Sequence, residues 1–512
     1  MIICATTPKS IVFRRKSFDY LRKRDKKVIF AQKIIGRTAE MKALQSYLDS
    51  GKSEFVALYG RRRVGKTFLI RMAAEDKFSF YVTGVHDATK AEQLTAFAIA
   101  MQKYSGSERL NIQKNWILAF YELSRYLESL PKGKKVIFID ELPWMDTPKS
   151  GFIAALENFW NSWAALRDDV KLIVCGSATS WMINNLIHSR GGLHNRLTHH
   201  LLLEPFCLRE CEEYFKEYGF SYSRKQIAEC YMVMGGIPYY MSMMDRSKSL
   251  AQNIDALFFS PNAELKDEFS DLYQALFKNA GPHIKVITAL STKGIGLTRK
   301  EIIAATGLTD NGAFSTVLEE LENCGFIRKY SPFGSNVSQN RKRLDSSSLY
   351  QMIDFYTLFY FRFIEKNSYQ DEHFWTTSVN SPLHNTWCGL SFEMLCLCHL
   401  KQIKMALGIS GVQTLACSWR GKGDESKKGV QIDLLIDRKD ETINLCEMKY
   451  SKDKFEISLA EEQRLSARLD TFRSETNTRK SVLLTLITAN GLKYNSHSDI
   501  VQNEVTLEEL FI

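Results

Sequence analysis

A glycine-rich turn between an apolar run and a helical pattern constrains this chain more than any other feature. The sequence GRRRVGKT at residues 60–67 has the spacing GxxxxGK[ST], follows the apolar run 55–59 and leads into a helical pattern at 67–74. Glycine at both ends of the turn allows backbone N–H groups to close around phosphate oxygens. Lys66 then reaches the β- and γ-phosphates, and the hydroxyl of Thr67 binds Mg²⁺. The turn therefore predicts a protein that binds ATP and Mg²⁺.

Two acidic residues follow a second apolar run, where a nucleotide-binding sheet needs a carboxylate. Residues 136–139 are apolar and lead into Asp140 and Glu141. We expect Asp140 to hold Mg²⁺ through its water shell, and Glu141 to orient or deprotonate the attacking water. Adjacent acids at this place favour hydrolysis over storage of the nucleotide, and the capping of a helix is the alternative role for both.

A third apolar run, 172–175, leads to Ser177, which we expect to face the γ-phosphate; an ordinary turn serine is the alternative. Arg190 and Arg196 are candidates to neutralise charge on that phosphate, within the chain or from another subunit, and surface arginines are the alternative. The residues expected to bind the nucleotide are Gly60, Arg61, Arg62, Arg63, Val64, Gly65, Lys66, Thr67, Phe68, Asp140 and Ser177.

Composition and patterning predict a soluble α/β chain of several domains. At about 150 residues per domain, 512 residues suggest three or four domains. Hydrophobic residues make up 45% and charged residues 25%, which is typical of globular protein. No run approaches 18 apolar residues, so we expect no membrane span. The 11 cysteines have no paired C-x2-C spacing, which favours a reduced, cytoplasmic protein.

The net charge of +10 is concentrated at the beginning of the chain. Residues 1–33 hold ten basic and two acidic residues, which leaves only +2 for the remainder. The body of the chain is therefore nearly neutral, and its bulk charge does not argue for DNA binding. The basic extension has the character of a nucleic-acid or membrane arm, a targeting peptide, or a segment translated from an upstream start codon.

Several motifs in a fixed order resemble the prokaryotic archaeal-type ATPases, a branch of the AAA+/STAND P-loop proteins. They are the GRTAE element at 36–40, the turn at 60–67, FIDELP at 138–143, GS at 176–177, EPF at 204–206 and GGIP at 235–238. The resemblance implies that Gly36, Arg37 and Pro238 lie near the nucleotide, with Pro238 in a helical lid. It also implies a winged helix and a C-terminal domain that resembles restriction endonucleases.

The winged-helix expectation agrees with three helical patterns at 284–290, 298–306 and 311–324, followed by a hairpin at 325–330 and 341–343. Thr298 and Glu301 have the spacing of a capping box. The third helix would enter a major groove through Asn311, Ser315 and Thr316, and the basic wing at 341–343 is the other candidate DNA contact. Because that helix also carries three glutamates, which phosphates repel, a role in contacts within the protein remains the alternative.

Three charged residues on two C-terminal strand patterns predict a second site, at which Mg²⁺ and a lysine would promote the attack of water on a phosphate. Asp433 lies on the first pattern, and Glu447 and Lys449 lie on the second, two residues apart and so on one face. This set resembles the PD-(D/E)xK nuclease superfamily, which implies an αβββαβ core with Glu393 on the preceding helix. Glu393, Asp433 and Glu447 would then bind Mg²⁺, with Glu447 and Lys449 catalytic. An inactive fold that keeps these residues as a salt-bridge network is the alternative.

We therefore expect an α/β multidomain protein with a P-loop parallel sheet. Its expected parts are a basic extension (1–33), a P-loop ATPase domain (34–206), a helical lid (207–280), a winged helix (281–345), an aromatic helical linker (346–385) and a nuclease-like domain (386–512). The expected function is Mg²⁺-dependent ATP hydrolysis coupled to a nuclease-like domain that acts on DNA, in a possible homo-oligomer. A regulatory switch or scaffold with an inactive C-terminal domain is the alternative.

Overall fold

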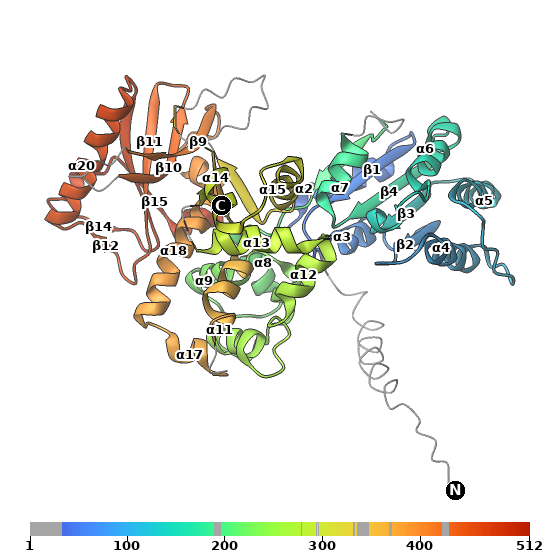
Figure 1. The fold of residues 1–512 in the computed structure, drawn as a ribbon, viewed down its shortest axis with the longest axis horizontal. Coiled ribbons are helices and arrows are strands. Elements are labelled where there is room, and N and C mark those ends of the chain that lie inside the picture. Colours follow the sequence, from blue (N-terminus) through green and yellow to red (C-terminus); the bar gives the residue numbers. More distant parts are fainter. Residues whose placement is uncertain are drawn as a thin grey trace, which may run out of the picture.

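The computed structural model describes residues 33–188, 196–277, 279–292, 294, 296–330, 333–334, 348–367, 371–421 and 430–512. The basic extension, apart from Lys33, therefore lies outside the described residues. Lys33 forms an ion pair with Glu217 at 3.4 Å. Figure 1 shows one sheet at each end of the molecule, with helices between them.

The N-terminal sheet is parallel and has five strands. Its order is β2 (Phe80–Thr83), β3 (Lys135–Asp140), β4 (Val170–Gly176), β1 (Glu54–Tyr59) and β5 (His199–Leu202). Along β1, Val56 and Leu58 join one apolar core, whereas Phe55 and Ala57 join another. Both faces are therefore covered, which confirms the predicted parallel sheet of an α/β P-loop fold. The short strands β2 and β5 were not predicted.

Helices cover this sheet and continue through the middle of the chain. Around the sheet lie α2 (Thr38–Asp49), α3 (Lys66–Ala73), α4 (Lys90–Ser105), α5 (Trp116–Ser129), α6 (Phe152–Ser162), α7 (Thr179–Met182) and the π-helix η4 (Ile183–Ile187). The region expected as a lid contains α8 (Leu208–Glu217), α9 (Arg224–Met234), α10 (Pro238–Met241), α11 (Leu250–Ile254), η5 (Asp255–Phe259) and α12 (Glu268–Leu276). The apolar core on one face of the N-terminal sheet continues through these helices.

Three helices and a small antiparallel sheet follow. They are α13 (Ala280–Ser291), α14 (Arg299–Thr306) and α15 (Gly312–Asn323), with strands β6 (Leu297–Thr298), β7 (Ile327–Tyr330) and β8 (Leu349–Met352). Thr298 and Glu301 form the expected capping box. The expected return strand at 341–343 lies outside the described residues, and the strand that pairs with β7 is β8.

The segment after β7 packs on the C-terminal domain. The Phe333 amide donates to the Ser418 carbonyl at 2.8 Å, and the Phe333 ring lies 5.2 Å from that of Phe472. After β8, Asp354 accepts a hydrogen bond from the Thr357 amide and starts helix α16 (Phe355–Phe359). The aromatic run continues through the π-helix η6 (Tyr360–Ile364) and then α17 (Phe374–Ser378).

The C-terminal domain contains a mixed sheet in the order β15-β13-β11-β10-β9. Strand β10 is antiparallel to β9 and β11, whereas β11, β13 and β15 are parallel. Its elements are α18 (Pro382–Cys398), α19 (Leu400–Ala406), β9 (Thr414–Arg420), β10 (Gln431–Arg438), β11 (Thr442–Lys449), β12 (Phe455–Glu456), α20 (Leu459–Thr476), β13 (Ser481–Thr488), β14 (Leu492–Lys493), β15 (Asn503–Thr506) and η8 (Leu507–Phe511).

Polar contacts join this domain to the central helices. The Leu208 amide donates to Nε2 of His399 at 3.2 Å, and the Tyr450 hydroxyl donates to Glu229 at 2.7 Å. Burial lowers the pKa of His399 to about 4, so the ring is neutral and its Nε2 accepts. Among the described residues, no helix combines the length and apolar character needed to cross a bilayer.

Candidate nucleotide site and C-terminal ionic cluster

The glycine-rich turn takes a backbone conformation that requires glycine at its first position. Gly60 has φ 141°, and a Cβ there would lie 2.3 Å from the Leu203 carbonyl oxygen. Gly65 has φ 92° and caps α3 at its N-terminus. The turn therefore connects the carboxyl end of β1 to the start of a helix, where unpaired N–H groups can face phosphate oxygens.

Lys66 folds back onto the turn that carries it. Its Nζ donates to the carbonyl oxygens of Gly60 and Arg61 at 3.0 and 2.8 Å, and to the Ser177 hydroxyl at 3.1 Å. Burial lowers the pKa of Lys66, while Cys175, Glu141 and other nearby groups oppose this shift. The ammonium group thus lies at the turn, within hydrogen-bond distance of the end of β4.

The structure brings Thr67 and Asp140 together. The Thr67 hydroxyl donates to Oδ2 of Asp140 at 2.9 Å, although the residues belong to different elements. Burial raises the pKa of Asp140, and hydrogen bonds from Cys175 and Thr67 oppose that rise. A hydroxyl and a carboxylate oxygen are the hard ligands that Mg²⁺ prefers, so this pair fits the expected ion.

Glu141 is held beside the same site by the end of β4. The Ser177 hydroxyl donates to Oε1 of Glu141 at 2.7 Å, and the Ser177 amide donates to Oε2 at 3.2 Å. Glu141 also has φ 47°, a left-handed conformation that is uncommon for a residue other than glycine. Lys66, Asp140, Glu141 and Ser177 therefore lie together at the carboxyl ends of strands β1, β3 and β4.

Two residues expected from the resemblance lie against the turn or close to it. Arg37 donates to the Glu204 carbonyl at 2.7 Å and to the Val64 carbonyl at 3.5 Å. A Cβ on Gly36 would lie 2.6 Å from Oε1 of Glu210. Pro238 begins α10, in which the rings of Tyr239 and Tyr240 pack against the guanidinium group of Arg63 in the turn.

The side chains of the turn arginines point to distant parts of the chain. Nη1 of Arg61 lies 2.5 Å from Oδ1 of Asp354, and both side chains are buried. Nη1 of Arg63 lies 2.5 Å from Oε2 of Glu268 at the start of α12. We predicted these arginines as nucleotide ligands. Three adjacent arginines in the sequence indicate acidic or anionic partners, but the sequence does not show which acids bind them.

Arg196 lies at the wrong end of the sheet to reach phosphates in its own chain. It precedes β5, and the following Thr198 amide bonds Phe55 near the start of β1. The turn follows the other end of β1, about 20 Å away for six residues at roughly 3.3 Å each. The prediction for Arg196 is therefore wrong within one chain. Arg190 lies outside the described residues.

The C-terminal charged residues also come together. Nζ of Lys449 lies 2.9 Å from Oε1 of Glu447 on the same face of β11. Asp433 precedes Leu434, which pairs with Cys446, so Asp433 lies beside Glu447 across the two strands. Burial, and then the carboxylates of Asp433 and Glu447, raise the pKa of Glu393 on α18 to about 7.

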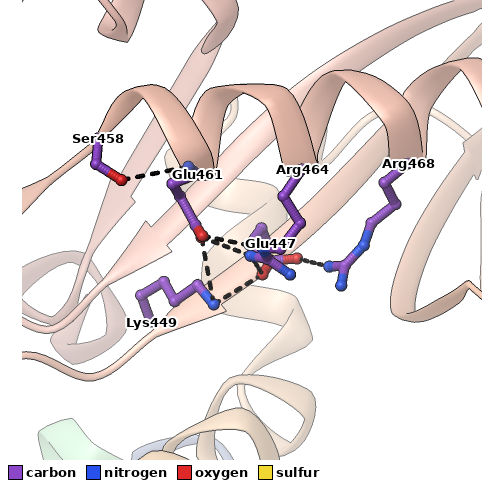
Figure 2. A network of polar contacts seen from close by, with 6 residues as sticks. All are labelled: Glu447, Lys449, Ser458, Glu461, Arg464 and Arg468. Atoms are coloured by element: carbon purple, nitrogen blue, oxygen red, sulfur yellow. Dashed lines mark hydrogen bonds and ion pairs between the residues drawn. The ribbon is translucent and has the colours of Figure 1, made fainter.

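Two arginines on α20, which sequence reasoning missed, bind Glu447 (Figure 2). Nη2 of Arg464 lies 2.9 Å from Oε1 of Glu447, and Arg468 binds Oε2. Arg464 also contacts Glu461 at 2.5 Å, and Lys449 lies 3.6 Å from Glu461. Burial would raise the pKa of Glu447, but Lys449 and Arg468 outweigh burial and lower it. We call these five residues the Glu447 cluster.

The three residues predicted to bind Mg²⁺ in this domain, Glu393, Asp433 and Glu447, do not form a metal site in the structure. Within the described parts of the chain, no three histidine, cysteine, aspartate or glutamate side chains are placed to hold a metal ion. Asp433 accepts a hydrogen bond from Gln431 at 2.5 Å, and basic groups occupy both oxygens of Glu447. Glu393, Asp433 and Glu447 are thus neighbours, but they are not arranged as metal ligands.

Comparisons with known proteins agree with the nucleotide site. Residues 34–244 match the model of an ATPase domain found predominantly in Archaea. An uncharacterized protein of Methanocaldococcus jannaschii is 24% identical over 364 residues, which cover 70% of this chain and 75% of the relative. Together with the parallel sheet and the turn, the family match identifies a P-loop, ATP-binding ATPase domain in this part of the chain.

Solved structures similar to the chain include a Walker-type ATPase and an ORC2 protein. The Walker-type ATPase of Pyrococcus abyssi has a TM-score of 0.45 and 17% identity, and the match covers 64% of this chain and 95% of that chain. The ORC2 protein of Aeropyrum pernix, in its ADPNP-ADP complexes, has a TM-score of 0.36 and 14% identity, with 64% and 93% covered.

Proposed function

We propose that this protein is a Mg²⁺-dependent ATPase whose nucleotide state is coupled to a C-terminal nuclease-like domain that acts on DNA. The observation that carries the proposal is the convergence of five polar side chains where β1, β3 and β4 end. They are Lys66, Thr67, Asp140, Glu141 and Ser177. Their spacing is that of a site for a phosphate, a metal ion and an attacking water.

Each side chain has a separate role in this proposal. Lys66 exchanges its bonds to the turn carbonyls for bonds to phosphate oxygens. Mg²⁺, held by Thr67 and by Asp140, neutralises charge on the phosphates when it is bound. Glu141 orients the attacking water and accepts its proton, and Ser177 fixes the carboxylate of Glu141 for this task.

The turn arginines provide the proposed link from nucleotide to the rest of the chain. A bound triphosphate reorients the backbone of residues 60–65, which also carries Arg61 and Arg63. Through the ion pairs with Asp354 and Glu268, that change reaches the starts of α16 and α12. The contacts of His399 and Tyr450 then continue the path to the C-terminal domain.

The DNA-binding part of the proposal rests on element order and on the charged set. Helix α18, strands β9 to β11, helix α20 and strand β13 follow the order α-β-β-β-α-β, and Glu393, Asp433, Glu447 and Lys449 lie together in it. We further assign α13 to α15 and β6 to β8 as a winged helix. Asn311, Ser315 and Thr316 near the start of α15 are its proposed DNA contacts.

A regulatory switch or scaffold is the second candidate function. The pairing of Glu447 with three basic side chains favours it, because a carboxylate held in this way serves as a structural element. In that case ATP turnover is present, and the C-terminal domain binds a partner without cleaving it.

Calorimetry and turnover test the ATPase part. Mg·ATP is expected to bind the wild-type chain and to be hydrolysed, and Lys66→Ala is expected to lose both. Lys42→Ala, an exposed lysine on α2, is the control. A folded wild-type chain that gives no heat with Mg·ATP would refute the proposed function.

Incubation with plasmid and short duplexes tests the nuclease part. Reactions contain Mg²⁺ or Mn²⁺, with and without ATP. Cleavage that Lys449→Ala abolishes supports the first candidate function. Intact ATP turnover without any cleavage supports the second.

A further inference from the structure

Two of the three basic side chains of the Glu447 cluster are clearly more exposed to solvent than its carboxylates. The side chains of Lys449, Arg464 and Arg468 are 29, 39 and 21% exposed, whereas those of Glu447 and Glu461 are 9 and 20% exposed. Lys449 and Arg464 are therefore the groups of the cluster that solvent reaches most easily. An anion that approaches this face of the domain from solvent meets them first.

The geometry of the two arginines suits a phosphate group. Arg464 and Arg468 are four residues apart on α20, so they project from the same face of the helix (Figure 2). A guanidinium group binds planar or tetrahedral oxyanions through paired N–H donors. Here the carboxylate oxygens of Glu447 receive those donors, one arginine to each oxygen.

We propose that Arg464, Arg468 and Lys449 bind the phosphodiester backbone of DNA, and that Glu447 takes the place of a phosphate in the free protein. A DNA phosphate that approaches α20 then replaces Glu447 as the partner of the arginines. The inference rests on the proposed action on DNA. It adds a phosphate contact on α20 to the contact that Lys449 on β11 provides.

Opposite effects of two kinds of substitution distinguish this proposal from a purely structural cluster. Arg464→Ala and Arg468→Ala remove phosphate contacts, so each should weaken DNA binding by roughly three- to tenfold and reduce the salt slope by about one. Glu447→Gln removes the competing charge, so it should tighten DNA binding. A structural cluster would give weaker binding or no change with Glu447→Gln.

Fluorescence anisotropy with a labelled 30-base-pair duplex, in a series of salt concentrations, measures these effects on the full chain. Lys493→Ala is the matched control, because Lys493 is 60% exposed in an ion pair with Glu456 on the same domain. Circular dichroism checks that each variant is folded. If Glu447→Gln does not fold, Arg468→Lys, which keeps the charge but loses the paired donors, should bind DNA between wild type and Arg468→Ala.

Two results would overturn the inference. Arginine variants that bind the duplex as wild type does, or a folded Glu447→Gln that binds it more weakly, refute the phosphate role and leave the proposed function in place. A wild-type chain that does not bind DNA at all refutes the DNA part of the proposed function together with the inference.

Discussion

Arg61 in the phosphate-binding turn forms a buried ion pair with Asp354, 293 residues further along the chain, with Nη1 and Oδ1 2.5 Å apart. Asp354 also accepts a hydrogen bond from the Thr357 amide at the start of α16. One carboxylate thus joins the nucleotide site to the beginning of the aromatic helix. The conformation of the turn and the position of that helix are therefore linked.

Loss of this carboxylate should destabilise the protein strongly. Asp354→Ala leaves the Arg61 guanidinium buried without its partner, which costs about 3–5 kcal/mol in comparable cases. The free energy of unfolding, measured by urea denaturation, checks this. Asp310→Ala is the control, because the Asp310 side chain is 61% exposed in its pair with Arg299 and should cost less than about 1 kcal/mol. Equal losses in the two variants would contradict a special role for Asp354.

Substitution of the first glycine of the turn should be far more harmful than substitution of a nearby surface glycine. Gly60→Ala places a methyl group against the Leu203 carbonyl and forces an unfavourable φ, so we expect a loss of stability of about 2 kcal/mol or more and weaker ATP binding. Gly51→Ala, with no atom near its Cβ position, should have little effect. Thermal unfolding and calorimetry with Mg·ATP compare the two; a Gly60→Ala variant with wild-type properties would show that the turn differs from that described.

Removal of the hydroxyl or the carboxylate of the proposed magnesium site should abolish the effect of Mg²⁺ on nucleotide binding. Thr67→Ala and Asp140→Asn are expected to weaken Mg·ATP binding about tenfold and to bind metal-free ATP nearly as wild type does. Titration calorimetry with and without Mg²⁺ measures this difference. Thr95→Ala on the exposed face of α4 serves as the control. Variants that keep the wild-type response to Mg²⁺ would exclude this pair as its site.

Glu141→Gln should separate binding of ATP from its hydrolysis. The amide keeps the size of the side chain but cannot accept a proton, so turnover should fall by about 10²–10⁴ while ATP affinity stays near wild type. Ser177→Ala should lower turnover less, because Glu141 remains and loses only the hydrogen bond from the Ser177 hydroxyl, while the backbone amide still donates to it. Steady-state phosphate release gives the rates, with Glu122→Gln on α5 as the control. Undiminished turnover in Glu141→Gln would assign the proton acceptor to another group.

Glu393 should make folding stability depend on pH between about 4.5 and 7. Its pKa rises from 4.5 in the unfolded chain to about 7 in the folded protein, so the folded state binds the extra proton in this range. The contribution of Glu393 to stability should therefore fall as pH rises through the range, by up to about 3 kcal/mol, and then level off. The charged groups around Glu393 are Asp433, Glu447, Lys449 and Arg468.

Urea denaturation at several pH values tests the contribution of Glu393. The free energy of unfolding of wild type relative to Glu393→Gln should fall as pH rises from 4.5 to 7, whereas the difference between wild type and Glu213→Gln, at an exposed site on α8, should stay constant. Parallel pH profiles for wild type and Glu393→Gln would show that Glu393 titrates normally.

Local patterns in the sequence predict a P-loop ATPase domain and the residues proposed for its nucleotide site. The GxxxxGK[ST] spacing and the acids after an apolar run are determined within a few residues, and the structure brings Thr67 and Asp140 within hydrogen-bond distance. Strands β2 (FYVT) and β5 (HHLL) were missed because neither has the four consecutive apolar residues that marked β3 and β4 in the sequence. The return strand was expected at 341–343, whereas β8, which pairs with β7, lies at Leu349–Met352.

The sequence did not predict the ion pairs between residues that lie far apart in the chain. Asp354 and Glu268 leave no local signal that connects them with the arginines of the turn. The same holds for Arg468, which is 21 residues from Glu447 and belongs to another element. At the turn and at Glu447, folding brings together charged residues that lie far apart in the sequence. The spacing of residues therefore predicted a role for each arginine or acid without showing its partner.

The hydrogen bond between the Leu208 amide and the His399 ring has a consequence for acid tolerance. Because the unfolded histidine takes up its proton near pH 6.5 and the folded one near 4, acidification across this interval removes the contribution of His399 to the free energy of unfolding and opposes the effect of Glu393. The ring nevertheless stays neutral in the folded molecules over most of this interval. Mild acid should therefore leave α8 joined to the C-terminal domain in the folded molecules, although it removes the contribution of His399 to their stability.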